Sequence, residues 1–485
     1  MYRHTTIANI RFKNLKQRQI MKKILFLLFA LLAFPGMAQE ENTSAPMPEI
    51  PNTYRYRVYL TDKKESPYSL KRPGEFLSEK ALQRRARLKL KVDEHDLPVS
   101  PTYINGLKEQ GMKVLHCSKW NNTAVVETQD TAAANALCAL PYVSRVVKVW
   151  KSNNRTVSAD RPERHSIVTN NLKATPKFYG AGQHQIEMLN GNLLHQQGFK
   201  GEGMTIAVID GGFYNADTLE ALSKCKILGT RNFVRPDRGV YDEQSHGMMV
   251  LSCIGANAPF SLVGTAPNAS FYLLVSEDGD SESLVEEDNW CAAVEYADSL
   301  GCDIITSSLG YTEFDDTTTS HQYHEMDGRT AINSRSASLA ASRGLLVLNS
   351  AGNSGNDQWK LIGFPADAHN ILAVGAVNAD GRNTLFSSLG NSADGRIKPE
   401  VMAMGGKTSL LDIDGSITRA NGTSFSCPVL CGAVACLWQA FPDKRPEEII
   451  KAVCQSGNNA QHPDNVYGYG IPDMWRAYHL LKNAK

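Results

Sequence analysis

The chain has almost no excess of charge of either sign. Its 51 Lys and Arg against 50 Asp and Glu give a formal net charge of +1 over 485 residues. Proteins that bind nucleic acid through its phosphates need a surplus of cations, so this balance argues against that class. Gly (37) and Pro (21) are too few for a collagen-like or low-complexity chain. With 42% hydrophobic residues, the chain can pack an ordinary globular core.

The cysteines and several other residues also lack the spacing of known metal-binding, redox and catalytic motifs. No two of the ten cysteines form CxxC, which excludes zinc-ribbon and thioredoxin-type sites. We expect buried, free thiols, with structural disulfides as the open alternative. His324-Glu325 has Gly328 where an HExxH zinc motif needs its second histidine. No G-x-S-x-G elbow surrounds Ser424, and no Walker or dinucleotide loop is present.

Long hydrophobic runs are scarce as well. One unbroken apolar run covers residues 24–34, after Lys22-Lys23 and before the small residues of 36–38. This pattern predicts a secretory signal peptide over residues 1–38, with Met1 or Met21 as the initiator. The run is too short to span a bilayer, and we expect no stable membrane anchor elsewhere. The expected destination is the periplasm or the outside of the cell.

Two linkers and a small domain follow. Residues 39–51 are polar and proline-rich, and residues 151–175 form a candidate exposed, cleavable linker. Between them, residues 52–150 show the order strand–helix–strand–strand–helix–strand, which predicts a small α+β ferredoxin-like domain. An additional basic helix carries Arg84, Arg85 and Arg87, and we expect this basic side to face solvent. A patch that binds an acidic ligand is the alternative.

The sequence pattern is different over residues 176–485. Short β-branched, nearly continuous apolar runs alternate with helices rich in small residues, which predicts an α/β fold with a parallel sheet covered on both faces. The predicted strands cover residues 204–209, 270–275, 302–306, 345–348 and 371–374.

Three residues in this part are candidates for nucleophilic catalysis. Asp210 ends a predicted strand, at the edge where α/β sheets bind ligands. His246 opens an apolar run, and Ser424 begins an apolar helix whose N-terminal N–H groups suit a developing oxyanion. Taken singly, Asp210 could cap a turn and His246 could be a packed core residue.

Together the segments around these residues resemble the three catalytic motifs of the subtilisin-like serine proteases (subtilases, peptidase S8). Their order along the chain, Asp, His, Ser, is that of subtilisin. A fourth segment, residues 350–355, is similar to the family's oxyanion asparagine segment. The resemblance runs from about Gly180 to Ala477. It implies a subtilisin-like catalytic domain and serine endopeptidase activity through an acyl-enzyme, with residues 52–150 as a propeptide.

The resemblance also implies a role for each residue. Asp210 would orient His246, and His246 would take the proton of Ser424. Asn353 and the backbone N–H of Ser424 would bind the oxyanion. A bulky apolar substrate side chain would occupy the S1 pocket, the pocket for the residue whose carbonyl is attacked. The implied substrate-binding residues are Ser308, Leu309, Gly310, Gly352 and Gly363.

The interpretation of the chain as a subtilase requires no cofactor. The acidic run of residues 277–280 could bind calcium, as in some family members, although EF-hand spacing is absent. Residues 311–329 look like an insertion, which we expect to be a solvated loop. A metal site is the alternative there, with Asp315, Asp316, His321 and His324 as ligands.

We therefore expect an exported, autoprocessed zymogen. Its partners would be a polypeptide substrate and its own propeptide as an intramolecular inhibitor. One alternative is a catalytically silent subtilase fold that binds peptides or proteins. Another is a structural envelope protein whose basic helix holds acidic polymers.

Overall fold

The computed structural model describes residues 51–152 and 174–484. The predicted signal peptide lies outside these residues. So do residues 39–50 of the first predicted linker and residues 153–173 of the second.

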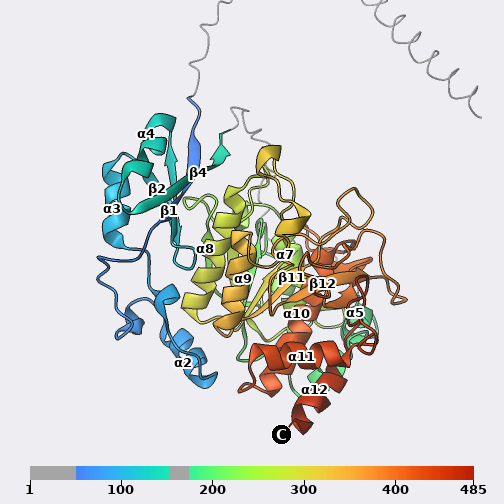
Figure 1. Cartoon of the computed structure of the whole chain (residues 1–485). Helices are drawn as coiled ribbons and strands as arrows, with labels where there is room; N and C mark the ends of the chain where they lie inside the picture. The colour runs from blue at the N-terminus through green and yellow to red at the C-terminus, as the bar shows by residue number, and fades with distance from the viewer. Residues whose placement is uncertain (1–50, 153–173, 485) are drawn as a thin grey trace, which may run out of the picture. The chain divides into compact units, whose positions relative to one another are not determined.

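The N-terminal domain is built on a four-stranded antiparallel sheet, blue to teal in Figure 1. Its order is β2-β3-β1-β4, with β1 next to both β3 and β4. The alternation in β1 buries Tyr56, Val58 and Leu60 against α3 and α4. This arrangement confirms the small ferredoxin-like domain. The elements are β1 (Tyr54–Leu60), α2 (Glu79–Arg87), α3 (Pro101–Glu109), β2 (Lys113–Ser118), β3 (Thr123–Thr128), α4 (Thr131–Ala136) and β4 (Val143–Lys151).

Helix α2 corrects the expectation of a solvated basic face. Ser78 caps it by accepting a hydrogen bond from the N–H of Ala81 at 3.1 Å. Arg84 and Arg85 are only 2% and 1% exposed, because both guanidinium groups pair with Asp298. The sequence pattern could not reveal this, since the partner lies more than 200 residues away.

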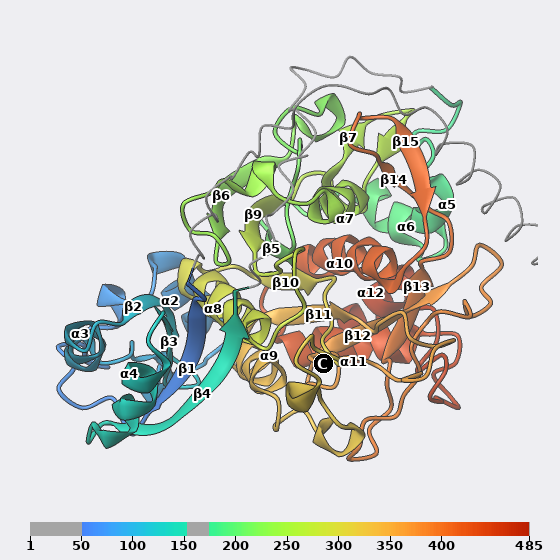
Figure 2. The same cartoon turned by 90° about the horizontal axis from the view of Figure 1, so that it is seen from above.

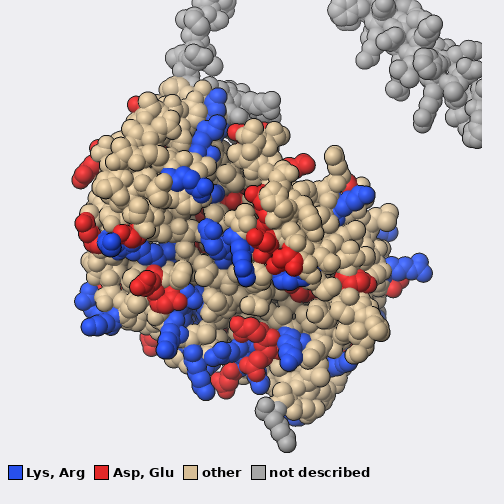
Figure 3. Space-filling view, viewed as in Figure 1, with Lys and Arg blue, Asp and Glu red and all other residues tan. Residues whose placement is uncertain are grey.

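The same burial removes the basis of the polyanion-binding alternative. Arg84 and Arg85 are not available to an acidic polymer, and half-exposed Arg87 pairs with Asp303 at 3.3 Å. On the face shown in Figure 3, basic and acidic side chains are intermixed. A polyanion site needs clustered, accessible cations.

The C-terminal domain contains a seven-stranded parallel sheet, in the order β13-β12-β11-β10-β5-β9-β6. Its strands are β5 (Thr205–Asp210), β6 (Lys226–Asn232), β9 (Ser270–Val275), β10 (Ile304–Ser307), β11 (Leu346–Ser350), β12 (Leu372–Val377) and β13 (Val401–Met404). Two hairpins complete the strands, β7 (Asn257–Ala258) with β8 (Leu262–Val263), and β14 (Thr408–Leu411) with β15 (Ile417–Ala420).

Helices cover both faces of this sheet, which confirms the α/β prediction (Figure 2). Alternate residues of β5 separate the two layers. Ile206 and Val208 pack with α7 and α10, whereas Ala207 and Ile209 pack with α8 and α9. The helices are α5 (Gln183–Glu187), α6 (Gly191–Gln196), α7 (His246–Gly255), α8 (Val285–Leu300), α9 (Ile332–Ser342), α10 (Thr423–Ala440), α11 (Pro446–Ser456) and α12 (Met474–Asn483).

Helix α10 passes through the middle of the core. It is apolar and long enough to cross a membrane, yet 89% of its 18 residues are buried inside the protein. Its apolar character therefore reflects packing against the sheet and α7. All ten cysteines are free and seven are buried, as expected for small apolar side chains.

The segment 311–329 is only partly the solvated loop that we expected. Asp315 and Asp316 are exposed, but Tyr311, Phe314 and Met326 are buried. His321 is also buried, with Nε2 2.7 Å from Glu287 and Nδ1 3.2 Å from Glu325. Tyr311, Phe314 and Met326 pack into the core. The mostly polar composition of the segment gave no indication of this burial.

Candidate active site

The three candidate catalytic residues line one cavity of about 340 Å³. Asp210 is the last residue of β5, His246 the first of α7 and Ser424 the second of α10. They come together because β5 ends at the same edge of the sheet at which α7 and α10 begin.

Asp210 and His246 are in direct contact. The Nδ1 atom of His246 lies 2.8 Å from Oδ1 of Asp210, and the N–H of Gly211 donates to the same oxygen at 2.8 Å. Asp210 is fully buried. A Cβ at Gly247 would lie 2.5 Å from the carbonyl oxygen of Gly212 and 2.8 Å from Cβ of Asp210. Glycine after His246 is therefore needed for this close approach.

The environment of His246 favours its protonated form. Burial of the imidazole lowers its pKa, but the Asp210 carboxylate outweighs burial through its charge and hydrogen bond. The pKa of His246 therefore lies above its ordinary value of 6.5. An imidazole with a raised pKa is a stronger base toward a hydroxyl proton.

Ser424 lies in the first turn of α10, after Gly422 at the N-cap. Its hydroxyl donates to the carbonyl oxygen of Ser308 at 3.3 Å, and not to His246. The Ser308 hydroxyl in turn donates to the carbonyl of Ser424 at 2.8 Å. Hydrogen bonds between a nucleophile and its base are often loose without substrate.

Asn353 also lines the cavity. Its amide oxygen accepts from the N–H of Thr423 at 2.9 Å and from the Thr423 hydroxyl at 3.0 Å. These two bonds fix the amide plane through its oxygen, which leaves the NH₂ group as the free donor.

The five residues that the resemblance implied for substrate binding all line the same cavity. They are Ser308, Leu309, Gly310, Gly352 and Gly363. Ser308 to Gly310 directly follow β10, whereas Gly352 follows β11.

Glu277 is a cavity residue that the sequence reasoning did not place in the active site. The sequence presents it, with residues 278–280, only as part of an acidic run that could bind calcium. In the structure, Arg235 binds Asp278 at 2.6 Å and Asp280 at 2.7 Å, while Glu277 lines the cavity. Its position in the sequence could have indicated a place in the active site, because Glu277 comes just after a strand of the parallel sheet, and Asp210 likewise lies at the end of a strand.

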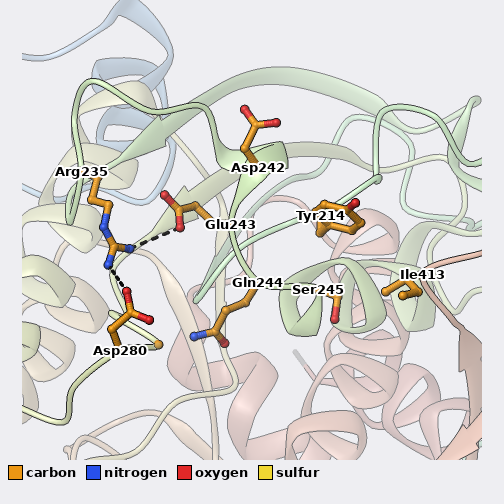
Figure 4. A pocket seen from close by; sticks show the side chains of 9 residues that line it. Tyr214, Arg235, Asp242, Glu243, Gln244, Ser245, Asp280 and Ile413 are labelled. Carbon is orange, nitrogen blue, oxygen red and sulfur yellow. Dashed lines mark hydrogen bonds and ion pairs between the residues drawn. The ribbon is translucent and has the colours of Figure 1, made fainter. Parts of the chain in front are cut away.

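A second cavity, of about 490 Å³, adjoins the first through Gln244, which lines both. Figure 4 shows Arg235 there between Glu243 and Asp280. A Cβ at Gly279 would fall 1.7 Å from Nε2 of Gln244, so this glycine lets the amide lie against the loop.

Comparisons with known proteins place this geometry in a family. The subtilase family (peptidase S8) matches residues 201–470, and the peptidase S8 propeptide domain of Bacteroidota matches residues 55–165. Subtilisin DY of Bacillus licheniformis is 27% identical over 280 residues, 56% of this chain and 90% of the relative. Subtilisin E of Bacillus subtilis (strain 168) is 28% identical over 340 residues, 69% and 75% of the two chains.

A solved structure has the same fold. It is the epidermin leader peptide processing serine protease of Staphylococcus aureus, which is 18% identical with a TM-score of 0.61. The match covers 90% of this chain and 99% of the other. From the two matched domains and these relatives, the chain belongs to the subtilase family of serine endopeptidases and carries a peptidase S8 propeptide domain before its catalytic domain.

Proposed function

We propose that Asp210, His246 and Ser424 are the catalytic triad of an exported endopeptidase, made as an autoprocessed zymogen. The observation that carries this proposal is the 2.8 Å contact between Asp210 and His246, in the cavity that also holds Ser424.

In the first half of the reaction, Oγ of Ser424 attacks the carbonyl carbon of the scissile peptide bond. Nε2 of His246 takes the hydroxyl proton, and Asp210 holds the Nδ1–H and stabilises the imidazolium. The tetrahedral oxyanion accepts hydrogen bonds from the Asn353 amide and the backbone N–H of Ser424. His246 then gives its proton to the leaving amine, and an ester on Ser424 remains.

In the second half, water attacks this ester. His246 takes a proton from the water and returns it to Ser424 as the carboxylic acid product leaves. Each half is balanced in atoms and protons without any added co-reactant, so the mechanism requires no metal.

The zymogen follows from the domain order. Residues 52–150 would inhibit the catalytic domain, and cleavage within residues 151–175 would separate the two. Residues 1–38 would direct export. The observation that supports docking of residues 52–150 on the catalytic domain is the set of buried ion pairs between them, such as Arg57 Nε with Asp288 at 2.7 Å.

A fluorophosphonate probe tests the proposal. After removal of the propeptide, we expect one adduct on Ser424, because its Oγ attacks phosphorus and expels fluoride. Mass spectrometry of the labelled peptide locates the adduct. A processed enzyme that takes up no label would favour the silent, peptide-binding alternative.

The pH dependence of the reaction reports on His246. Protonated imidazole cannot accept the proton of Ser424, so we expect kcat/KM to fall as the pH drops through the His246 pKa. Because Asp210 holds this pKa above 6.5, the acid limb should have its midpoint above 6.5. Asp210→Asn should lower kcat by about 10⁴-fold, since the imidazole loses its orienting partner. A midpoint at or below 6.5 in the wild type would contradict the assignment.

A further inference from the structure

The two walls of the catalytic cavity differ in charge. Glycines and neutral side chains form the wall beside Gly352 and Gly363. The opposite wall carries the carboxyl groups of Asp210 and Glu277, and no Lys or Arg is among the described residues that line the cavity. The Oδ2 atom of Asp210 is buried there without a hydrogen-bond partner.

Sheet order places these walls on opposite sides of the proposed substrate strand. Gly352 follows β11 on one side of β10. Glu277 lies two residues after Val275 of β9, and Val275 is the register partner of Asp210. A peptide paired with residues 308–310 directs successive side chains to opposite sides. P1 is the substrate residue on the acyl side of the scissile bond, and P2 is the residue before it. If the P1 side chain lies against the glycine-lined wall, the P2 side chain faces Glu277.

The Glu277 carboxyl group is held in place but is not paired with a Lys or Arg. Its Oε2 accepts a hydrogen bond from the hydroxyl of fully buried Tyr311 at 3.1 Å. Among the described residues, no Lys, Arg or His forms an ion pair with it. Burial, followed by the charge of Glu282, raises the pKa of Glu277 to about 8. The Tyr311 hydrogen bond and His246 oppose this shift only in part. The free carboxyl group is therefore largely protonated at neutral pH, and an approaching cation would lower its pKa and favour the charged form.

Three neighbouring acidic residues, Asp278, Asp280 and Glu286, have hydrogen-bond or ion-pair partners, and none of the three lines the catalytic cavity. Arg235 binds Asp278 and Asp280, as Figure 4 shows for Asp280. Glu286 accepts from the N–H groups of Asp278 at 2.9 Å and Ser283 at 3.0 Å. Arg235 lines the second cavity and not the catalytic one.

We propose that Glu277 determines specificity by accepting a basic P2 side chain, so that the enzyme prefers Lys or Arg immediately before an apolar P1 residue. This inference rests on the proposed proteolytic function and adds the substrate class. The Lys or Arg side chain of the substrate would form the ion pair with Glu277 that no described residue of the protein forms. Charge pairs in partly desolvated sites contribute more than exposed surface pairs do.

The test compares two substrates on the same enzyme sample. Fluorogenic peptides share an apolar P1 residue and carry Lys or Gln at P2. We expect the wild type to favour P2 Lys by about 10-fold or more in kcat/KM. Glu277→Gln should bring this ratio close to one, while its amide oxygen can still accept from Tyr311. Because the ratio is internal to each sample, partial misfolding cancels.

Asp280→Asn is the matched control. It removes a carboxyl group from the same loop, but one that pairs with Arg235 and lines the second cavity only. The Lys-to-Gln ratio should stay at its wild-type value. A wild-type ratio near one, or a ratio unchanged in Glu277→Gln, would overturn the proposal for Glu277. Failure of the proposed function would look different, because the wild type would then cleave neither peptide and take up no fluorophosphonate.

Discussion

Ser424→Ala is expected to leave purified residues 39–485 uncleaved, whereas the wild-type protein shortens between about residues 151 and 180. Without Oγ no acyl-enzyme can form, and His246 has no hydroxyl to deprotonate. In subtilisin, loss of the nucleophile reduces kcat by about 10⁶-fold. At such a rate, processing would not be seen in an ordinary incubation. A time course of intact mass and N-terminal sequence measures the result and identifies the processed bond.

Ser426→Ala is the matched control for this experiment. Ser426 lies two residues further along α10, fully buried, and its hydroxyl donates to the carbonyl of Thr423 at 3.0 Å. It does not line the catalytic cavity. We expect this variant to process as the wild type does. If Ser424→Ala shortens at the wild-type rate, another protease makes the cut. If the wild type neither shortens nor takes up label, the autoprocessing proposal is wrong.

The second large effect is expected from Asp298→Ala, at the interface between the propeptide and the catalytic domain. Asp298 in α8 is fully buried and contacts three propeptide cations, Arg84, Arg85 and Lys119. Burial alone would raise the pKa of Asp298, but Lys119 and the two arginines hold it well below its usual range. These attractions therefore stabilise the docked propeptide at neutral pH, and the stabilisation is lost only in strong acid.

Removing this carboxylate leaves buried cations without their shared partner. Breaking a buried pair in this way typically costs about 3–5 kcal/mol. We therefore expect the cleaved propeptide to dissociate about 10²–10⁴-fold more readily from the Asp298→Ala enzyme. The lag between processing and the appearance of peptidase activity should shorten accordingly. Size-exclusion chromatography of the processed mixture gives an independent measure of the bound fraction.

Arg87→Ala provides the comparison for Asp298→Ala. Arg87 belongs to the same basic helix, but its side chain is 35% exposed and its contact with Asp303 is 3.3 Å. Such exposed pairs contribute about 0–1 kcal/mol, so the lag should change by a few-fold at most. Equal effects of the two variants would show that buried charge does not hold the propeptide in place.

Several elements could be predicted because their signals are local. The order of strands and helices in residues 52–150 was predicted correctly, since patterns such as the alternation in β1 (Tyr54–Leu60) act over a few residues. The nearly continuous apolar runs identified five strands of the parallel sheet, with ends that differ by at most three residues. The edge strand β6 was not predicted, because its residues are mostly exposed and carry no buried pattern.

Charge was harder to interpret than hydrophobicity. The arginines of α2 looked like a solvated face, since a sequence does not reveal a partner 213 residues away. Glu277 looked like part of an acidic run, because its two neighbours gave no sign that Arg235 would bind them. His321 looked exposed, although Glu287 and Glu325 enclose it. Arg85 and Asp298 are 213 residues apart, Arg235 and Asp278 are 43 apart, and His321 and Glu287 are 34 apart, so the fold decides these pairings.

By itself, the sequence determined the order of the domains, five of the seven strands of the catalytic sheet, and the residues Asp210, His246, Asn353 and Ser424 as candidates. Apolar periodicity and short motifs act over a few residues, so they can be read along the chain. Only the tertiary structure decided that Glu277 lines the catalytic cavity without a paired Lys or Arg. It also decided that Asp298 forms ion pairs with three basic residues of the propeptide. Electrostatic partners depend on distance and burial, which exist only after distant segments have packed together.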